Sequence, residues 1–349
     1  MNKIPPLIIN IDDISLSDNE KEIISHELIG GIIIFSHNYS SISQLQNLIH
    51  DIKSINNNIL VSIDHEGGRV QRLKNNFTIL PSFEDIGRIY STDKSLALNL
   101  SYAAGYIAGY ELSNIGFDIN YSPVIDIGNE NSKVLQNRTF GNTVQKIYDL
   151  SKKYISGSID SGIIPVLKHF PGHGAVNDDS HTTYCQSDKD FDKMSETDIR
   201  LFKDLFNKFN LPIMTGHIAF SNIDKNIVTY SKKWLIQHSQ NIFASKPMFI
   251  SDDLEMYAAK SNENTASKRV ILALEAGCNM IIATTMQQKN IISNKESYLF
   301  FLENYLTDEI IEYYHKNHDR IKPVLNDFIT KKSVDLYKDS LRLIGDIYG

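Results

Sequence analysis

Eight short apolar runs, each followed by a longer segment, constrain the fold of this chain more than any other feature. The runs are Leu7–Ile11, Gly31–Phe35, Ile59–Ile63, Phe117–Val124, Ile164–His169, Leu211–His217, Met248–Ser251 and Cys278–Ala283. Alternating strands and helices are typical of a parallel sheet with helical crossovers, and eight strands can close into a barrel. We therefore predict an α/β protein with a single (β/α)8 TIM-type barrel. An open doubly wound sheet is the alternative, weakened because no G-x-G-x-x-G follows the first run.

Segments between these runs have the character of helices. They are Asp18–Ile29, Ser41–Ile55, Asp93–Ile115, Gln145–Gly162, Ser195–Phe209, Lys233–Phe243 and Ser267–Gly277. Ser17 and Asp18 are candidate caps of the first helix, and Ser195 is a candidate cap of the fifth. The chain after Asn290 is helical and polar. We predict a catalytic barrel over residues 1–290 and a helical C-terminal cap packed on it over residues 291–349.

Composition and charge narrow the class of protein. The chain has 349 residues, of which 42% are hydrophobic, and its net charge of −7 argues against a nucleic-acid partner. No stretch approaches the roughly 20 apolar residues that cross a bilayer, and the first residues do not form a signal peptide. The two cysteines, Cys185 and Cys278, fit reduced thiols. We expect a cytoplasmic monomer without a membrane partner.

Polar residues gather where the predicted strands end. DHEGGRVQR follows the third run at residues 64–72, KHFPGHG ends the fifth at 168–174, and SDD ends the seventh at 251–253. Active sites of such barrels lie at the carboxyl ends of the strands. Because buried charges are costly unless they are paired or functional, these residues indicate one polar ligand site.

The segment KHFPGHGAVNDDSH, residues 168–181, forms a loop because it contains two glycines and a proline. Asp179 and His181 are two positions apart and can face one side of a turn. An aspartate bonded to a histidine fixes its tautomer and supports its charged form, which suits proton transfer. A metal site that includes His173 is the alternative. The residues alone favour proton transfer and metal binding equally.

A carboxylate at the end of the seventh strand is placed to attack an electrophile or to stabilise positive charge. Adjacent residues of a strand point to opposite faces, so we expect Asp252 to face the pocket and Asp253 to cap a helix or bond the next loop.

Charged residues after the third and fourth runs complete the candidate site. Asp64 can accept sugar hydroxyl protons and Arg72 can donate in return. Two purely structural roles are the alternatives to ligand binding. Glu66 could pair with Arg69, and Arg138 could form a surface salt bridge.

Taken together, these segments resemble glycoside hydrolase family 3, and most of all its short NagZ-type bacterial β-N-acetylglucosaminidases. The shared motifs are GGIIIFSHN at 30–38, IDHEGGRVQRL at 63–73, NYSPVIDI at 120–127, NRTFG at 137–141, KHFPGHG…DSH at 168–181 and ISDDLEM at 250–256. The resemblance as a whole extends from about Leu7 to about Thr284. The sequence departs from the family pattern at three positions. His65 stands where the family commonly has Gln, His37 where it commonly has Arg, and Asn279 where Asp is usual.

The resemblance implies roles for individual residues. Asp252 matches the nucleophile, His181 the general acid/base and Asp179 its dyad partner. The residues that match sugar-binding positions are Asp64, Arg72, Arg138, Lys168 and His169.

The resemblance also implies the reaction. The expected activity is retaining removal of terminal β-linked N-acetylglucosamine from cytosolic muropeptides, without metal or cofactor. These substrates carry an anhydro-N-acetylmuramic acid, with or without a peptide.

Three other activities remain alternatives. A family 3 β-glucosidase would share the fold and mechanism. A glycoside phosphorylase would exploit an imidazole, which repels phosphate less than a carboxylate does. A metallohydrolase would use His169, His173, His181 and Asp179 as ligands.

Overall fold

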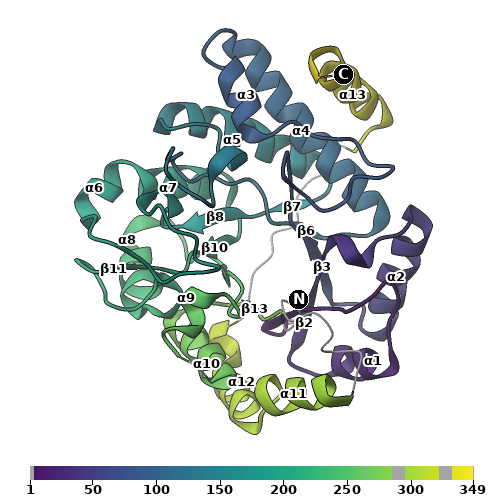
Figure 1. Ribbon diagram of the computed structural model, residues 1–349, viewed down its shortest axis with the longest axis vertical. Helices are drawn as coiled ribbons and strands as arrows, with labels where there is room; N and C mark the ends of the chain where they lie inside the picture. The colour runs from purple at the N-terminus through teal and green to yellow at the C-terminus, as the bar shows by residue number, and fades with distance from the viewer. Residues whose placement is uncertain (1–3, 264, 285–294, 322–331, 349) are drawn as a thin grey trace.

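The computed structural model describes residues 4–263, 265–284, 295–321 and 332–348. Parallel strands occupy the centre of the molecule and helices surround them (Figure 1). The central strands are β1 (Leu7–Asn10), β2 (Ile29–Ile34), β3 (Leu60–Ile63), β6 (Ile119–Asn120), β7 (Ile164–Pro165), β8 (Leu167–Phe170), β10 (Ile213–Thr215), β12 (Phe249–Ser251) and β13 (Ile281–Ile282). The helices are α1 (Asp18–Ser25), α2 (Ile42–Ile55), α3 (Phe83–Ile89), α4 (Lys94–Ile115), α5 (Val144–Asp160), α6 (Phe191–Glu196), α7 (Asp198–Phe209), α8 (Ser239–Ile242), α9 (Tyr257–Lys260), α10 (Ala266–Ala276), α11 (Lys295–Tyr305), α12 (Asp308–Ile321) and α13 (Val334–Tyr348).

The central strands form two parallel sheets. One has six strands in the order β13-β1-β2-β3-β6-β7, and the other has three in the order β12-β10-β8. Isolated parallel bridges link Val124 to Lys168 and Ile250 to Met280. The predicted α/β class with a parallel sheet is confirmed, whereas closure into an eight-stranded barrel stays a prediction.

Side chains of the strands alternate between two buried layers. In β1, Leu7 and Ile9 belong to the large core beneath the helices. Ile8 belongs instead to a smaller central cluster with residues of other strands, among them Ile33 and Met214. Burial on both faces is why these strands are continuous apolar runs. The central cluster forms a floor below the carboxyl ends of the strands.

Several strands and helices are shorter than predicted, and local causes explain two of them. The fourth run pairs as β6 only over Ile119–Asn120, and Pro123, which follows closely, has no N–H to donate to a sheet. The first helix ends at Ser25 rather than at Ile29, because Ile29 pairs with Leu7 in the sheet. Ser17 caps that helix in a capping box with Glu20, as expected.

The prediction that Ser195 caps a helix over Ser195–Phe209 is wrong. Ser195 lies inside α6, where its hydroxyl donates to the Phe191 carbonyl at 2.9 Å. A break at Thr197 separates α6 from α7. The predicted helix over Lys233–Phe243 is a π-helix, η5 (Lys233–His238), followed by α8.

Short elements near the strand ends were not predicted, including α3 and α9. β4 (His65–Gly67) and β5 (Val70–Gln71) form an antiparallel hairpin directly after β3. β9 (Cys185–Ser187) pairs in parallel with β11 (Ile218–Phe220). Because β9 begins four residues after His181, this pairing anchors one end of the loop that carries the predicted dyad.

The C-terminal helices divide between two sides of the molecule. α11 and α12 pack beside α10, whereas α13 packs along α4 (Figure 1). The predicted boundary between residues 290 and 291 lies outside the described residues, so the division into two units stays a prediction. Within the described ranges, no helix combines the length and the apolar character that crossing a bilayer requires.

Candidate active site

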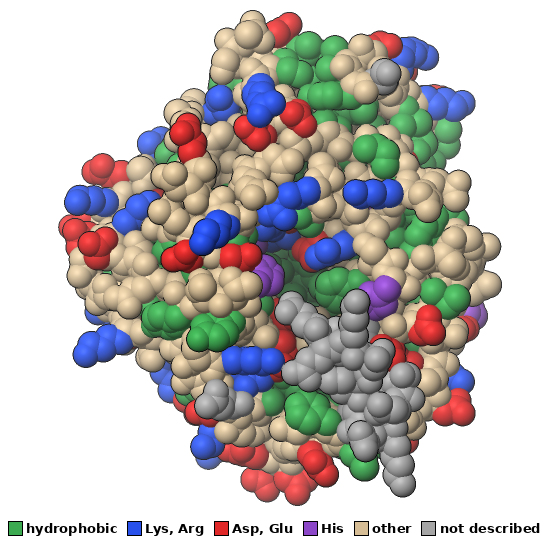
Figure 2. Space-filling model, viewed as in Figure 1, with side chains coloured by type: hydrophobic (Ala, Val, Ile, Leu, Met, Phe, Trp, Pro, Cys, Tyr) green, Lys and Arg blue, Asp and Glu red, His purple; other side chains and the backbone are tan. Residues whose placement is uncertain are grey.

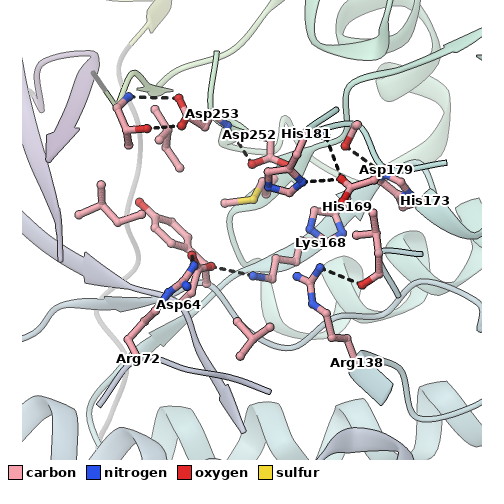
Figure 3. A pocket seen from close by; sticks show the side chains of 18 of the residues that line it. Asp64, Arg72, Arg138, Lys168, His169, His173, Asp179, His181, Asp252 and Asp253 are labelled. Carbon is pink, nitrogen blue, oxygen red and sulfur yellow. Dashed lines mark hydrogen bonds and ion pairs between the residues drawn. The ribbon is translucent and has the colours of Figure 1, made fainter. Parts of the chain in front are cut away.

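One cavity of about 300 Å³ is lined by all eight residues predicted to form the site. They are Asp64, Arg72, Arg138, Lys168, His169, Asp179, His181 and Asp252. Asp64 follows β3, Lys168 and His169 lie in β8, and Asp252 follows β12, so the site is at the carboxyl ends of the strands. Figure 2 shows that the surface is hollowed there, with histidine and acidic side chains at the opening. Figure 3 shows the side chains converging on the cavity.

A network of alternating charges lies along one wall of this cavity. The Lys168 ammonium lies 2.9 Å from a carboxylate oxygen of Asp64 and 2.7 Å from one of Glu66. Arg138 donates to both oxygens of Glu66, at 2.7 and 2.9 Å, and Arg72 lies 3.1 Å from Asp64. The Lys168 and Glu66 side chains are each 2% exposed, so their charges depend on one another for stabilisation.

The pKa values of the two acids report this pairing. Burial raises the pKa of Asp64, but Lys168 and Arg72 outweigh it and leave the pKa well below the usual range. Burial likewise raises the pKa of Glu66, and Arg138 and Lys168 lower it to about 2. Both carboxylates are therefore ionised at neutral pH, and Asp64 keeps lone pairs with which to accept hydroxyl protons.

Both structural alternatives for this region are wrong. Glu66 pairs with Arg138 and Lys168 rather than with Arg69. Arg138 forms its ion pair inside the cavity wall and not at the surface, since its side chain is 10% exposed. Arg69 is exposed and donates to the Val134 carbonyl instead.

Asp126 holds two histidines of the site and was missed in the sequence. Its buried carboxylate accepts from the His169 ring at 2.7 Å and from the His173 amide at 2.7 Å. Burial raises the pKa of Asp126, but His169 outweighs it and keeps the pKa low. The signal was present, because Asp126 is the one charged residue in the apolar motif NYSPVIDI.

The predicted dyad is formed. The Asp179 carboxylate oxygen Oδ1 lies 2.7 Å from His181 Nδ1 and accepts the His181 amide at 2.9 Å. Burial raises the pKa of Asp179, but its bonds to His181 lower it overall. The His181 side chain is 46% exposed, so its other ring nitrogen is accessible from the pocket.

Ser180, between the two members of the dyad, anchors the dyad loop through two hydrogen-bond contacts. It is buried, and its hydroxyl lies 3.1 Å from His173 Nε2. Its carbonyl accepts the amide of Ala258 in α9 at 3.1 Å. These contacts join the dyad loop to the segment that follows Asp252.

Asp252 lies at the end of β12 and faces the dyad (Figure 3). Its Oδ1 accepts the Asp253 amide at 2.8 Å. Burial raises the pKa of Asp252, but His169, His217 and His181 lower it overall. The carboxylate is therefore ionised at neutral pH, as an attacking group requires.

Asp253 also lines the cavity, so the expectation that it points elsewhere is wrong. It is nevertheless the predicted hydrogen-bond partner of the next loop. Its carboxylate accepts the Glu255 amide at 3.0 Å and the Thr284 amide at 3.1 Å, and it contacts the Thr284 hydroxyl. Burial raises the pKa of Asp253 to about 7.

The histidines of the site bond to protein groups. His169 bonds to Asp126, His173 to Ser180 and His181 to Asp179. Within the described ranges, no group of three or more His, Cys, Asp or Glu side chains is arranged to hold a metal ion.

Residues 4–301 match the profile of the glycosyl hydrolase family 3 N terminal domain. A β-hexosaminidase of Psychromonas ingrahamii is 36% identical over 280 residues, which are 80% of this chain and 82% of that protein. A β-hexosaminidase of Nitrosomonas eutropha is 34% identical over 278 residues, or 79% of this chain and 80% of that protein.

Solved structures share the fold. Native NagZ from Neisseria gonorrhoeae superposes with a TM-score of 0.81 at 24% identity, covering 99% of this chain and 98% of that one. The same protein in complex with N-trifluoroacetyl-D-glucosamine gives a TM-score of 0.81 at 24% identity, covering 98% of each chain.

Proposed function

The chain belongs to glycosyl hydrolase family 3, and we propose that it is a retaining exo-β-N-acetylglucosaminidase. The observation that carries the proposal is the pairing, across one cavity, of an ionised Asp252 with the Asp179–His181 dyad. The names of the β-hexosaminidase relatives and the complex of NagZ with a glucosamine derivative support the same activity.

In the proposed first step, Asp252 attacks the anomeric carbon and a covalent glycosyl-enzyme forms. His181 protonates the departing glycosidic oxygen. Its Nδ1 is bonded to Asp179, so the proton passes from Nε2. Because Asp179 is ionised, it stabilises the imidazolium before transfer and fixes the ring orientation.

In the second step, neutral His181 accepts a proton from water, which attacks the anomeric carbon and displaces Asp252. N-acetylglucosamine leaves with its configuration retained. The histidine suits both steps, because an imidazole can donate a proton in its charged form and accept one in its neutral form.

The proposed binding of the sugar uses the charged wall opposite the dyad. Asp64 would accept hydroxyl protons, while Arg72, Arg138, Lys168 and His169 would hold the ring through donated hydrogen bonds. Asp64 and Lys168 are already oriented by each other, which reduces the entropy lost on binding. The apolar floor below includes side chains of the central cluster, among them Ile33 and Met214.

We also propose that the physiological substrates are cytosolic wall fragments, N-acetylglucosaminyl-anhydro-N-acetylmuramic acid with or without a peptide. This would place the enzyme in the cytoplasm. The resemblance of its motifs to the NagZ-type enzymes supports this substrate.

The two parallel sheets are proposed to form one closed (β/α)8 barrel. The bridges between Val124 and Lys168 and between Ile250 and Met280 support closure at both junctions. Backbone bonds from Ile125 to Lys168 at 2.9 Å and from Ser251 to Met280 at 2.9 Å lie at the same places.

The decisive assay is hydrolysis of 4-nitrophenyl β-N-acetylglucosaminide with a chelator present, compared with the matching glucoside. We expect N-acetylglucosamine release that the chelator does not reduce. Faster cleavage of the glucoside would favour the β-glucosidase, and loss of activity restored by zinc would favour a metallohydrolase. A sugar 1-phosphate formed when phosphate is added would indicate the phosphorylase.

The nucleophile is tested by trapping with a 2-fluoro sugar and by Asp252→Ala. We expect the label on Asp252 and a fall in turnover of about 10⁴-fold or more, because attack on the anomeric carbon is lost. A label on another residue would reject this assignment.

A further inference from the structure

His217 is a buried histidine beside the site that the proposed mechanism does not use. It lies between β10 and β11, and its side chain is 0% exposed. It is not one of the described residues that line the cavity. The Asp252 carboxylate is nevertheless within electrostatic range, since it raises the pKa of His217 while burial lowers that pKa more strongly. Any effect of His217 on the reaction must therefore pass through the groups that its ring contacts.

Both ring nitrogens of His217 have partners, and these partners define its tautomer. Nε2 lies 2.9 Å from the Asp253 carbonyl oxygen, which can only accept, so Nε2 carries the proton and donates. Nδ1 lies 2.8 Å from the Thr229 hydroxyl of the 3-10 helix η4 (Val228–Tyr230). Burial keeps the pKa of His217 low, so the ring is neutral and Nδ1 accepts from that hydroxyl. The Thr229 hydroxyl also lies 2.9 Å from the Thr215 hydroxyl, and the ring is thereby held on both sides.

The Asp253 carbonyl belongs to the backbone that orients the nucleophile. The Asp253 amide donates to Oδ1 of Asp252 at 2.8 Å, and the Asp252 amide donates to the Thr215 carbonyl at 3.2 Å. The Asp253 carbonyl accepts from His217 and also from the Met256 amide at 3.0 Å. Met256 lies in the same loop as Asp253, whereas His217 follows β10, the strand that pairs with β12. His217 thus ties the loop after β12 to the end of the neighbouring strand.

The two carboxylate oxygens of Asp252 are held differently (Figure 3). Oδ1 accepts the Asp253 amide, while no hydrogen bond from the described residues reaches Oδ2. A fixed Asp253 backbone therefore fixes the rotation of the carboxylate and leaves one oxygen available for attack. Accurate placement matters, because displacing a reacting group by about 1 Å can cost about 10²-fold in rate.

We propose that His217 is a positioning residue for Asp252. Through the Asp253 carbonyl it holds the backbone amide that fixes Oδ1, so that Oδ2 is presented to the anomeric carbon. This role rests on the proposed function, since it takes Asp252 as the nucleophile. Because His217 does not line the cavity, its loss should slow the attack without weakening the binding of the sugar.

Two substitutions separate the ring nitrogens of His217. In His217→Asn the amide takes the place of Nδ1 and can still bond to Thr229, but no donor reaches the Asp253 carbonyl. In His217→Gln the amide takes the place of Nε2 and can donate to that carbonyl. On 4-nitrophenyl β-N-acetylglucosaminide we expect kcat/KM to fall about 100-fold in His217→Asn and less than about tenfold in His217→Gln.

The control is His238→Asn. His238 is a half-buried histidine of η5 that stacks on Phe191 with 4.2 Å between ring centroids, and it is not one of the described residues that line the cavity. We expect its substitution to change kcat/KM by less than about twofold, whatever it costs in stability.

Two measurements distinguish positioning of the nucleophile from a purely structural role. Inactivation by the 2-fluoro sugar gives a rate constant for attack and a separate binding constant. We expect His217→Asn to lower the rate constant about 100-fold and to leave the binding constant within about twofold. The loss in kcat/KM should also be equal on the phenyl and the 4-nitrophenyl glycosides, because both need the same nucleophile and differ only in their need for protonation.

The outcomes separate this inference from the proposed function. A wild type that does not cleave 4-nitrophenyl β-N-acetylglucosaminide, or a label on a residue other than Asp252, rejects the proposed function. With both of these intact, an unchanged rate constant in His217→Asn, a weakened binding constant in its place, equal losses in His217→Gln, or a larger loss on the phenyl glycoside rejects the positioning role.

A second variant decides the question if His217→Asn does not fold. Thr229→Val removes the hydroxyl that bonds to Nδ1 and leaves the ring free to turn away from the Asp253 carbonyl. A lower rate constant of inactivation with an unchanged binding constant supports the positioning role, and an unchanged rate constant rejects it.

Discussion

Two charged groups face each other across the cavity and are held in opposite ways. The network of Asp64, Lys168, Glu66 and Arg138 is buried and joins residues up to 104 positions apart in the chain. The Asp179–His181 pair is local, with its members only two positions apart, and both side chains are at least 30% exposed. One group is part of the protein interior and the other lies on a loop at the surface.

The difference corresponds to two proposed tasks. Binding a sugar in one orientation benefits from side chains that are fixed before the ligand arrives, which a buried network provides. Delivering and accepting protons requires access to water and to a departing group, which an exposed loop provides. We therefore expect changes in the network to affect stability, and changes in the dyad to affect turnover alone.

His181→Ala should produce the largest effect and separate the two tasks most clearly. We expect kcat/KM to fall by up to about 10⁴-fold on a disaccharide, and far less on an activated aryl glycoside that needs little protonation. The free energy of unfolding, measured with urea, should change by less than about 0.5 kcal/mol because the side chain is exposed. Equal losses on both substrates would count against His181 as the acid.

Glu66→Gln should have the converse effect. It leaves the charges of Lys168 and Arg138 without their shared partner in a buried site, and we expect the free energy of unfolding to fall by about 3–5 kcal/mol. Glu84→Gln is the matched control, since Glu84 pairs with Arg88 at 2.9 Å with exposed side chains. The control should cost less than about 0.5 kcal/mol. Similar losses in both variants would remove the contrast drawn between the two groups.

Asp253 allows a test by pH. Its pKa of about 7 in the folded protein exceeds the ordinary value of 3.8, so the folded protein binds more protons than the unfolded chain between these values. The contribution of Asp253 to the free energy of unfolding should therefore decrease as the pH rises from about 4 to about 7, by at most on the order of 1 kcal/mol per pH unit.

Urea unfolding of the wild type and of Asp253→Asn over this range measures the effect. The asparagine cannot titrate, so its curve should lack this decrease. Asp192→Asn, which changes an exposed aspartate of α6, should follow the wild type. A wild-type curve parallel to that of Asp253→Asn would contradict the raised pKa.

Tyr305→Phe should have the smallest effect. The Tyr305 hydroxyl, from α11, contacts the Glu255 carboxylate, which Arg269 of α10 also binds. Removing one of these donors should lower the free energy of unfolding by about 1 kcal/mol. Tyr298→Phe, on the same helix, should cost less because that side chain is only half-buried, whereas Tyr305 is fully buried. A large loss of turnover in Tyr305→Phe would show that the C-terminal helices support the site directly.

Much of the site was readable in the sequence because parallel strands end at one edge. Polar residues after three predicted strands were expected to meet, and all eight predicted residues line one cavity. The capping box of Ser17 and Glu20 and the Asp179–His181 bond were also predictable, since both involve residues two or three positions apart. The roles assigned to these residues stay predictions.

The sequence by itself determined where the strand ends and the local motifs lie, because hydrophobic periodicity and short-range hydrogen bonds depend on neighbouring residues. Only the tertiary structure decided which charges pair. Glu66 could equally have formed an ion pair with Arg69, three positions away. In the fold it pairs instead with Lys168, because the strand that carries Lys168 lies nearby, and with Arg138. Asp126 reaches His169 across 43 positions for the same reason. Long-range pairs depend on which strands are adjacent and how deeply they are buried, and neither is written in any one segment.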